Sequence, residues 1–200
     1  MKKKLILNYS NLILTVLTIL CTCLLIYFYR RPNSLEYIYN TLALLFLLWL
    51  MVVINKLFKL KIANIIVLIY YLHLSINILF GVILKINEFL PFYHYLSLVI
   101  TGIIFYVFGL YVIVRIDNIG FLKFSVINFF SLFFAISLLV GVEVVKYLVY
   151  KIIGIIIINY VNNINAFIFI VFGAIITNII AFIDNKYYKS QKLEQVLKCF

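Results

Sequence analysis

The chain has 200 residues, of which 67% are hydrophobic and 12% charged, and its mean hydropathy is +1.21. A soluble domain of about this length still exposes close to a third of its unfolded surface, so it cannot hide so many apolar residues, and a water-soluble globule is excluded. The formal net charge of +11 comes from basic residues scattered between apolar runs. They form no continuous basic face of the kind that binds nucleic acid, so we expect a membrane protein whose main partner is the lipid bilayer.

Six apolar runs are long enough to cross a bilayer, which takes about 20 residues in a helix. Hydrocarbon offers no partner to backbone N–H and C=O groups, so these runs must be helical even where Val, Ile and Phe favour strands in water. The fold class is therefore all-α: a polytopic bundle of six transmembrane helices in one transmembrane domain, 1–200. The predicted spans are 12–29, 37–54, 62–84, 92–114, 124–142 and 164–183.

Lys and Arg residues near the span ends predict the orientation. With the N-terminus inside, twelve of them fall on the cytoplasmic side and five on the outer side, as the positive-inside rule requires. We therefore expect a multi-pass protein of the cell membrane, with both termini in the cytoplasm. Residues 184–200 would then form a short basic amphipathic tail on the cytoplasmic leaflet.

The segment 143–163 is the hardest to place. It is fairly apolar but is interrupted by Lys151. If it were a seventh span, the C-terminal lysines would move outside and the charge bias would disappear. We expect instead an extension of the fifth helix on the outer side, or a re-entrant or interfacial segment, between the fifth and sixth spans.

Polar residues inside the spans are costly and therefore mark candidate sites. His73 lies near the predicted midplane, and helical spacing places Tyr70 and Asn77 on its face. The fifth and sixth spans carry further polar side chains at similar depth. Together these residues could bind a small solute, or they could be interhelical hydrogen-bonding groups that only stabilise packing. The candidate ligand-binding residues are Tyr70, His73, Asn77, Asn128, Ser131, Thr177 and Asn178.

A second polar group is predicted at the outer surface, formed by His94, Glu143, Lys146 and Asn162. Glu143 and Lys146 are three residues apart and could simply neutralise each other on one helix face. A zinc site that joins His73 to His94 and Glu143 is not expected, because His73 lies about 16 Å deeper at 1.5 Å per residue. Zinc ligands lie about 2 Å from the ion. We expect no metal and no cofactor.

Small residues predict close helix contacts. Gly102 and Gly109 are seven residues apart in the fourth span, and Ala166, Gly173 and Ala181 recur on one side of the sixth. Small side chains let helix backbones approach each other in a bilayer. We interpret them as packing residues.

Three segments carry a resemblance to a known family. They are 91–102 (PFYHYLSLVITG), 141–147 (GVEVVKY) and 162–174 (NNINAFIFIVFGA). They resemble, in turn, a family segment with Asp and then His before a Gly, a Trp-Glu-x-x-Glu-Tyr element, and an Asp-rich turn with a Gly-Ala helix. The later two thirds of the chain thus resembles YjdF-like small bacterial multi-pass membrane proteins, which are distantly similar to VanZ-like proteins. That resemblance implies a membrane protein of undefined biochemical role.

The chain departs from the family pattern at most of the acidic positions. Glu143 alone matches an acidic residue of the family, so the resemblance implies no shared activity. The departures are His94 for Asp, Leu98 for His, Lys146 for the second Glu, and Asn162 and Ala166 for Asp.

Our interpretation of function is a non-enzymatic multi-pass membrane protein of undefined role. Two alternatives stay open. The first is a membrane solute-binding subunit, similar in size and span number to the S components of energy-coupling-factor transporters, with a small-molecule solute or a partner membrane subunit. The second is a membrane-embedded enzyme that acts on lipid at the outer headgroup level, for which His94 and Glu143 would be the acid/base pair.

Overall fold

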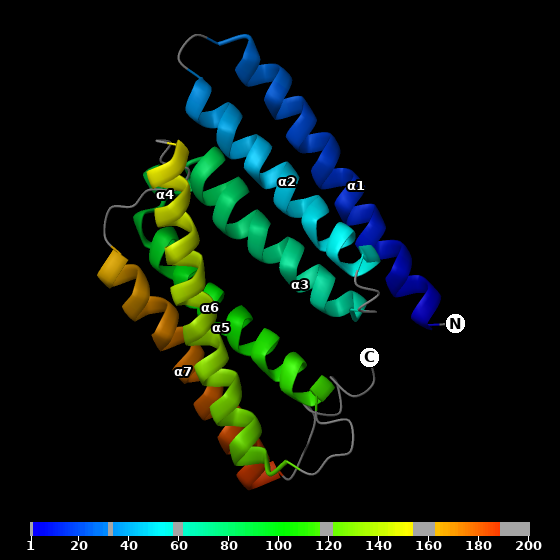
Figure 1. The fold of residues 1–200 in the computed structure, drawn as a ribbon, viewed down its shortest axis with the longest axis vertical. Coiled ribbons are helices and arrows are strands. Elements are labelled where there is room, and N and C mark those ends of the chain that lie inside the picture. The colour runs from blue at the N-terminus through cyan, green and yellow to red at the C-terminus, as the bar shows by residue number, and fades with distance from the viewer. Residues whose placement is uncertain (1, 32–33, 58–61, 117–121, 154–162, 189–200) are drawn as a thin grey trace. The chain divides into compact units, whose positions relative to one another are not determined.

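The computed structural model describes residues 2–31, 34–57, 62–116, 122–153 and 163–188, and these residues form helices and no strand (Figure 1). Among these described residues, six helices are long and apolar enough to cross a membrane, which confirms the predicted all-α fold with six spans. The apolar windows are Tyr9–Tyr29, Leu35–Leu57, Asn64–Ile83, Pro91–Ile116, Phe124–Val145 and Asn165–Ile183.

The chain divides into two compact units, residues 1–93 and 94–200. The helices of the first unit lie side by side in Figure 1, with α1 and α2 antiparallel and the third span against both. The first unit contains α1 (Lys2–Tyr29), α2 (Leu35–Leu57), α3 (Asn64–Leu74), the π-helix η1 (Ser75–Ile83) and α4 (Ile86–Phe89).

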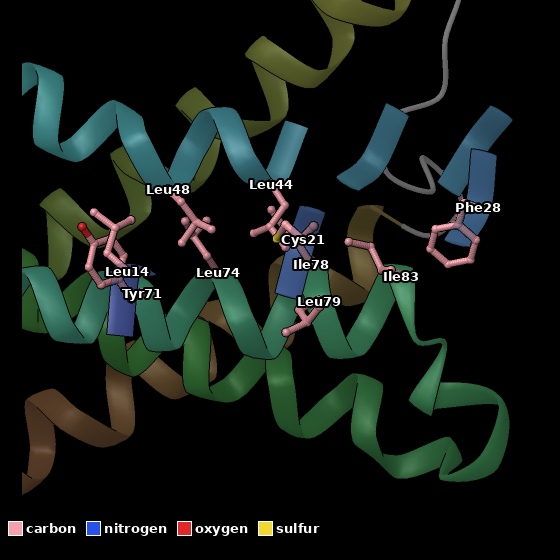
Figure 2. Close-up of a cluster of buried hydrophobic side chains, with 10 residues drawn as sticks. All are labelled: Leu14, Cys21, Phe28, Leu44, Leu48, Tyr71, Leu74, Ile78, Leu79 and Ile83. Carbon is pink, nitrogen blue, oxygen red and sulfur yellow. The ribbon is translucent and has the colours of Figure 1, made fainter. Parts of the chain in front are cut away.

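The core of the first unit follows helical spacing. From α1 come Leu14, Cys21 and Phe28, seven residues apart, and they meet Leu44 and Leu48 of α2 (Figure 2). Side chains that recur every seven residues lie on one side of a helix, so a single stripe of α1 is buried. The third span completes this core with Tyr71, Leu74, Ile78, Leu79 and Ile83.

The third span changes its winding partway along. It is α-helical to Leu74 and then π-helical over η1, where the Leu84 N–H donates to the Leu79 carbonyl five residues back at 2.9 Å. Side-chain donors surround the start of this segment: the Ser75 hydroxyl bonds to the Tyr71 carbonyl and the Tyr93 hydroxyl to the Ile76 carbonyl. π-helices are rare and often accompany functional sites.

A left-handed residue ends the third span. Lys85 has φ 49° and ψ 42°, a conformation that Gly or Asn usually supplies after a helix end. Its ammonium lies 4.9 Å from the centroid of the Tyr37 ring and 3.7 Å from a Glu88 oxygen. These contacts fix the side chain of a residue whose backbone is strained.

The second unit is built from three long helices, the first of which begins in the first unit. Close contacts between its helices occur at glycine residues. A Cβ on Gly102 would overlap the Ile170 carbonyl oxygen, and one on Gly173 would overlap the Val99 carbonyl oxygen. The three helices are α5 (Pro91–Ile116), α6 (Phe124–Ile153) and α7 (Asn163–Tyr188).

Large apolar side chains cover the outside of the helices. Phe46 of α2 is 65% exposed and Phe133 of α6 is 64% exposed. In water such surfaces would be unstable, whereas lipid accepts them. Hydroxyls on α1 bond to their own helix, as Thr18 does to the Leu14 carbonyl at 2.7 Å, so they present no unpaired donor to hydrocarbon.

The fifth predicted span extends well beyond residue 142, because α6 continues as a helix to Ile153. The described part of 143–163 is therefore a helical extension. The predicted re-entrant or interfacial part, 154–162, and the end of the predicted basic tail, 189–200, lie outside the described residues.

Candidate functional site

Polar side chains from all three helices of the second unit meet around Asn128 of α6. The Tyr106 hydroxyl of α5 donates to the Asn128 side-chain oxygen at 2.7 Å, and the Asn178 side-chain nitrogen of α7 donates to the Asn128 backbone oxygen at 3.2 Å. The Tyr106 hydroxyl also interacts with the Asn178 side chain. Tyr106 is fully buried and Asn128 is 3% exposed. We call these three residues the Asn128 site.

One polar atom of the Asn128 site has no protein partner. The side-chain nitrogen of Asn128 is buried and makes no hydrogen bond with the described residues. An unsatisfied buried donor costs about 1–3 kcal/mol, so it marks a position where an acceptor would be stabilised. The Asn128 site therefore presents an amide N–H donor that an oxygen acceptor could use.

The neighbouring hydroxyls do not take part in this network. The Ser131 hydroxyl donates to the Ile127 carbonyl and the Thr177 hydroxyl to the Gly173 carbonyl, each at 2.8 Å within its own helix. Ser131 instead marks a close contact between helices, since a Cβ on Gly109 would lie 2.8 Å from its Cα and carbonyl oxygen. Of the four candidate residues in this unit, the structure joins Asn128 and Asn178. The hydroxyls of Ser131 and Thr177 bond instead to backbone carbonyls of their own helices.

The candidate residues of the first unit form a separate stripe along the third span. The Asn77 side-chain nitrogen lies 3.1 Å from both the His73 ring Nδ1 and the His73 carbonyl oxygen. Asn77 is thus paired with a residue one turn before it in the same span. The Tyr70 hydroxyl turns to the Leu47 carbonyl of α2 at 2.8 Å. A cluster that joins this stripe to the second unit stays a prediction.

The outer polar residues are only partly described. His94 is exposed at the start of α5, with its ring 5.7 Å from that of Tyr95, and Glu143 is half-buried in α6. Lys146 lies within α6, but its side chain is not among those described, and Asn162 lies outside the described residues. The acid/base pair of His94 and Glu143 therefore stays a prediction.

Metal-ligating side chains do not gather within the described ranges. No group of three or more His, Cys, Asp and Glu residues is found there that could hold an ion. The side chains of the Asn128 site are also uncharged. These three side chains can therefore donate and accept hydrogen bonds.

Sequence reasoning missed Tyr106. Tyrosine is frequent in this chain and marks the membrane interface at several span ends, so its residue type alone did not identify Tyr106 as a candidate site residue. Its position carried the signal: Tyr106 lies in the middle of Pro91–Ile116, far from either headgroup region, where a buried hydroxyl needs a partner. The preference of a mid-span tyrosine for a polar partner could have identified it.

Comparison with family models, characterised proteins and solved structures finds no match to this chain. The fold and the composition of its helices define it as a multi-pass membrane protein.

Proposed function

We propose that this chain is a non-enzymatic membrane protein that binds a small uncharged polar solute at the Asn128 site, between α5, α6 and α7. The observation that carries the proposal is the buried side-chain nitrogen of Asn128, which lacks an acceptor among the described residues. A solute that offers a carbonyl, hydroxyl or ether oxygen would satisfy it. The Asn178 amide and the Tyr106 hydroxyl stand beside it as orienting groups.

The absence of charge at these three side chains argues for a neutral solute. Moving an ion into hydrocarbon is very costly unless an opposite charge pairs with it. Amides and a phenol instead exchange hydrogen bonds with neutral polar groups. This supports the solute-binding alternative over a lipid-modifying enzyme, which would need an acid and a base within reach of its substrate.

The main competing interpretation is helix packing with a bound water. A buried water commonly satisfies a single orphaned donor, and interhelical hydrogen bonds in membranes contribute about 0.6 kcal/mol each. Under that interpretation Asn128 stabilises the unit and binds no solute. The two interpretations differ in whether the site holds a molecule larger than water that is lost when Asn128 is replaced.

Native mass spectrometry of the purified chain tests the proposal. We expect a bound small molecule in the wild type, and its loss in Asn128→Leu and Asn178→Leu, which keep side-chain volume and remove the amides. Ser131→Ala is the matched control, because it removes a buried polar group of α6 that bonds only to its own helix among the described residues. It should keep the solute. Wild-type protein without a solute, or loss in Asn77→Leu but not in Asn128→Leu, would refute this assignment.

The orientation is part of the same proposal. The excess of Lys and Arg on one side of the six spans supports a cytoplasmic location for both termini. The resemblance to YjdF-like proteins is compatible with this arrangement but supplies no activity. The chain's role would then be to bind or pass a solute in the membrane, alone or with a partner subunit.

A further inference from the structure

Five side chains form a continuous ladder at one end of the first unit. The Arg31 guanidinium lies 4.5 Å from the Tyr27 ring centroid, and that ring lies 5.4 Å from the Phe28 ring. Phe28 stacks on Tyr37 at 4.8 Å, and the Lys85 ammonium lies 4.9 Å from the Tyr37 ring centroid. The ladder thus connects the end of α1, the start of α2 and the turn after η1, and it has a cation at each end.

The two ends of the ladder differ in their charge balance. Lys85 contacts the Glu88 carboxylate at 3.7 Å and is attracted by Glu36 as well, so its charge is largely matched. Arg31 instead adjoins Arg30, and both arginines are exposed. The described residues provide an ion pair for Lys85 but none for these two arginines. The Arg30–Arg31 end therefore carries an excess of positive charge.

Stacking leaves the hydrogen-bonding edge of Arg31 available. A guanidinium that lies over an aromatic ring uses its face in that contact, while its five N–H donors point outward in the plane. Two of these donors match two oxygens of one phosphate. Tyr27 therefore acts as a platform that fixes the direction of the Arg31 donors.

The surroundings of Arg31 select a lipid over a free anion. The first span ends at Tyr29, two residues before Arg31, which places the guanidinium at headgroup level. Apolar side chains next to it in sequence are open to lipid, with Ile26 55% and Tyr29 84% exposed. Acyl chains would lie along this face directly below a phosphate. A zwitterionic lipid carries a positive group on its headgroup, and Arg30 would repel that group. An anionic lipid therefore fits better than a zwitterionic one.

We propose that Arg30 and Arg31, supported by Tyr27, bind the phosphate of an anionic phospholipid at this end of the first unit. This site belongs to the first unit, and the proposal does not rest on the Asn128 site. A simpler explanation is that the two arginines only complement the dipole at the C-terminal end of α1, since cations there are stabilising. A lysine serves the dipole equally well but cannot make the bidentate phosphate contact.

Lipid retention tests the proposal on the full chain. Purified protein is incubated with phosphatidylglycerol or with phosphatidylcholine of the same acyl chains, and retained lipids are counted by native mass spectrometry. We expect the wild type to prefer phosphatidylglycerol. Each of Arg30→Gln and Arg31→Gln should weaken that retention about fivefold, and Arg31→Lys, which keeps the charge, should weaken it as well. Inorganic phosphate should not displace the lipid.

Lys56→Gln is the matched control. Lys56 is exposed in the last turn of α2, at the other end of that helix from Tyr37, and its replacement removes the same charge. The control should keep the preference for phosphatidylglycerol. Equal retention of both lipids by the wild type, equal loss in Lys56→Gln, or full retention in Arg31→Lys would overturn the proposal.

Discussion

The hydroxyl of Tyr106 donates a 2.7 Å hydrogen bond to the side-chain oxygen of Asn128, 22 residues away in the sequence. Both side chains are buried, so neither is exposed to bulk solvent or lipid. This bond joins α5 to α6 beside the contact of Gly109 with Ser131, where the two helices approach closely. The hydrogen bond and the close helix contact therefore lie next to each other, and a substitution that changes one should also affect the other.

Removing the Tyr106 hydroxyl should destabilise the second unit without disturbing its shape. In Tyr106→Phe the buried Asn128 side-chain oxygen loses its donor, and we expect a loss of about 1 kcal/mol in the free energy of unfolding. Reversible unfolding in mixed micelles measures this loss. In a double-mutant cycle, Tyr106→Phe should cost much less when Asn128 is already leucine, because no orphaned oxygen then remains.

Tyr95→Phe is the matched control for that cycle. Tyr95 lies on the same helix but is exposed, and its ring contact with Phe169 at 4.8 Å does not need the hydroxyl. We expect no measurable change. If Tyr106→Phe is as neutral as Tyr95→Phe, the hydrogen bond between Tyr106 and Asn128 contributes nothing to stability.

The glycines of the α5–α7 contact should tolerate no side chain. A methyl group on Gly102 or Gly173 would overlap backbone atoms of the other helix, which cannot rotate away as a side chain can. We expect Gly102→Ala and Gly173→Ala each to destabilise the protein by about 1–3 kcal/mol or to separate the helices. Thermal unfolding in detergent, followed by circular dichroism, gives the size of the effect.

Gly141 provides the comparison. A Cβ at this position has no atom within 4 Å, so Gly141→Ala meets no obstacle. Alanine is the better helix former by up to about 1 kcal/mol, and this variant should be neutral or slightly more stable than the wild type. Equal destabilisation of Gly141→Ala and Gly102→Ala would contradict the role of close backbone approach.

Hydropathy and charge were sufficient to predict the spans. The first span was predicted to begin at Leu12, and its described apolar window begins at Tyr9. The fifth was predicted to end at Val142, and its apolar window ends at Val145 within a helix that continues to Ile153. The positions of the spans follow because backbone N–H and C=O groups must be paired inside lipid. This requirement does not depend on the details of the side chains. The π-helix in the third span could not be predicted, because a change from four-residue to five-residue bonding leaves hydropathy unaltered.

The candidate site was harder to predict because it depends on partners. Sequence spacing placed Asn77 correctly beside His73, since that pair lies within one helix at i and i+4. It could not tell that Asn128 would meet Tyr106, because helix rotation and register between spans are determined by packing.

Lys85 should stabilise the first unit in a pH-dependent way. Its hydrogen bond to Tyr37, supported by Glu88 and Glu36, raises the pKa of its ammonium above the ordinary value of 10.5. A raised pKa means that the folded state holds the proton more tightly. The stabilisation is therefore complete below pH 10.5 and is lost as the pH rises through the folded-state pKa. Lys85→Gln should lower the melting temperature at pH 7 and pH 9 by equal amounts.

The difference in melting temperature between Lys85→Gln and the wild type should then shrink at strongly alkaline pH. In Tyr37→Phe, which keeps the ring and removes the hydroxyl, the effect of Lys85→Gln should be smaller but still present, because the cation–π contact remains. A difference that is the same at pH 7 and pH 12 would show that Lys85 acts through its backbone conformation or its methylene groups and not through its charge.

The membrane orientation predicts opposite accessibility for the two ends of the third span. Lys56 precedes this span and Asn87 follows it, both are exposed, and the Asn64–Ile83 window between them is long enough to cross the bilayer. In a background with Cys21, Cys23 and Cys199 replaced, a membrane-impermeant maleimide should label Asn87→Cys in intact cells. It should label Lys56→Cys only after permeabilisation, because the positive-inside rule places Lys56 in the cytoplasm. The reverse pattern would invert the orientation while keeping the six spans. Labelling of both positions in intact cells would mean that the third span does not cross, and that the π-helix and the His73–Asn77 pair lie outside the hydrocarbon.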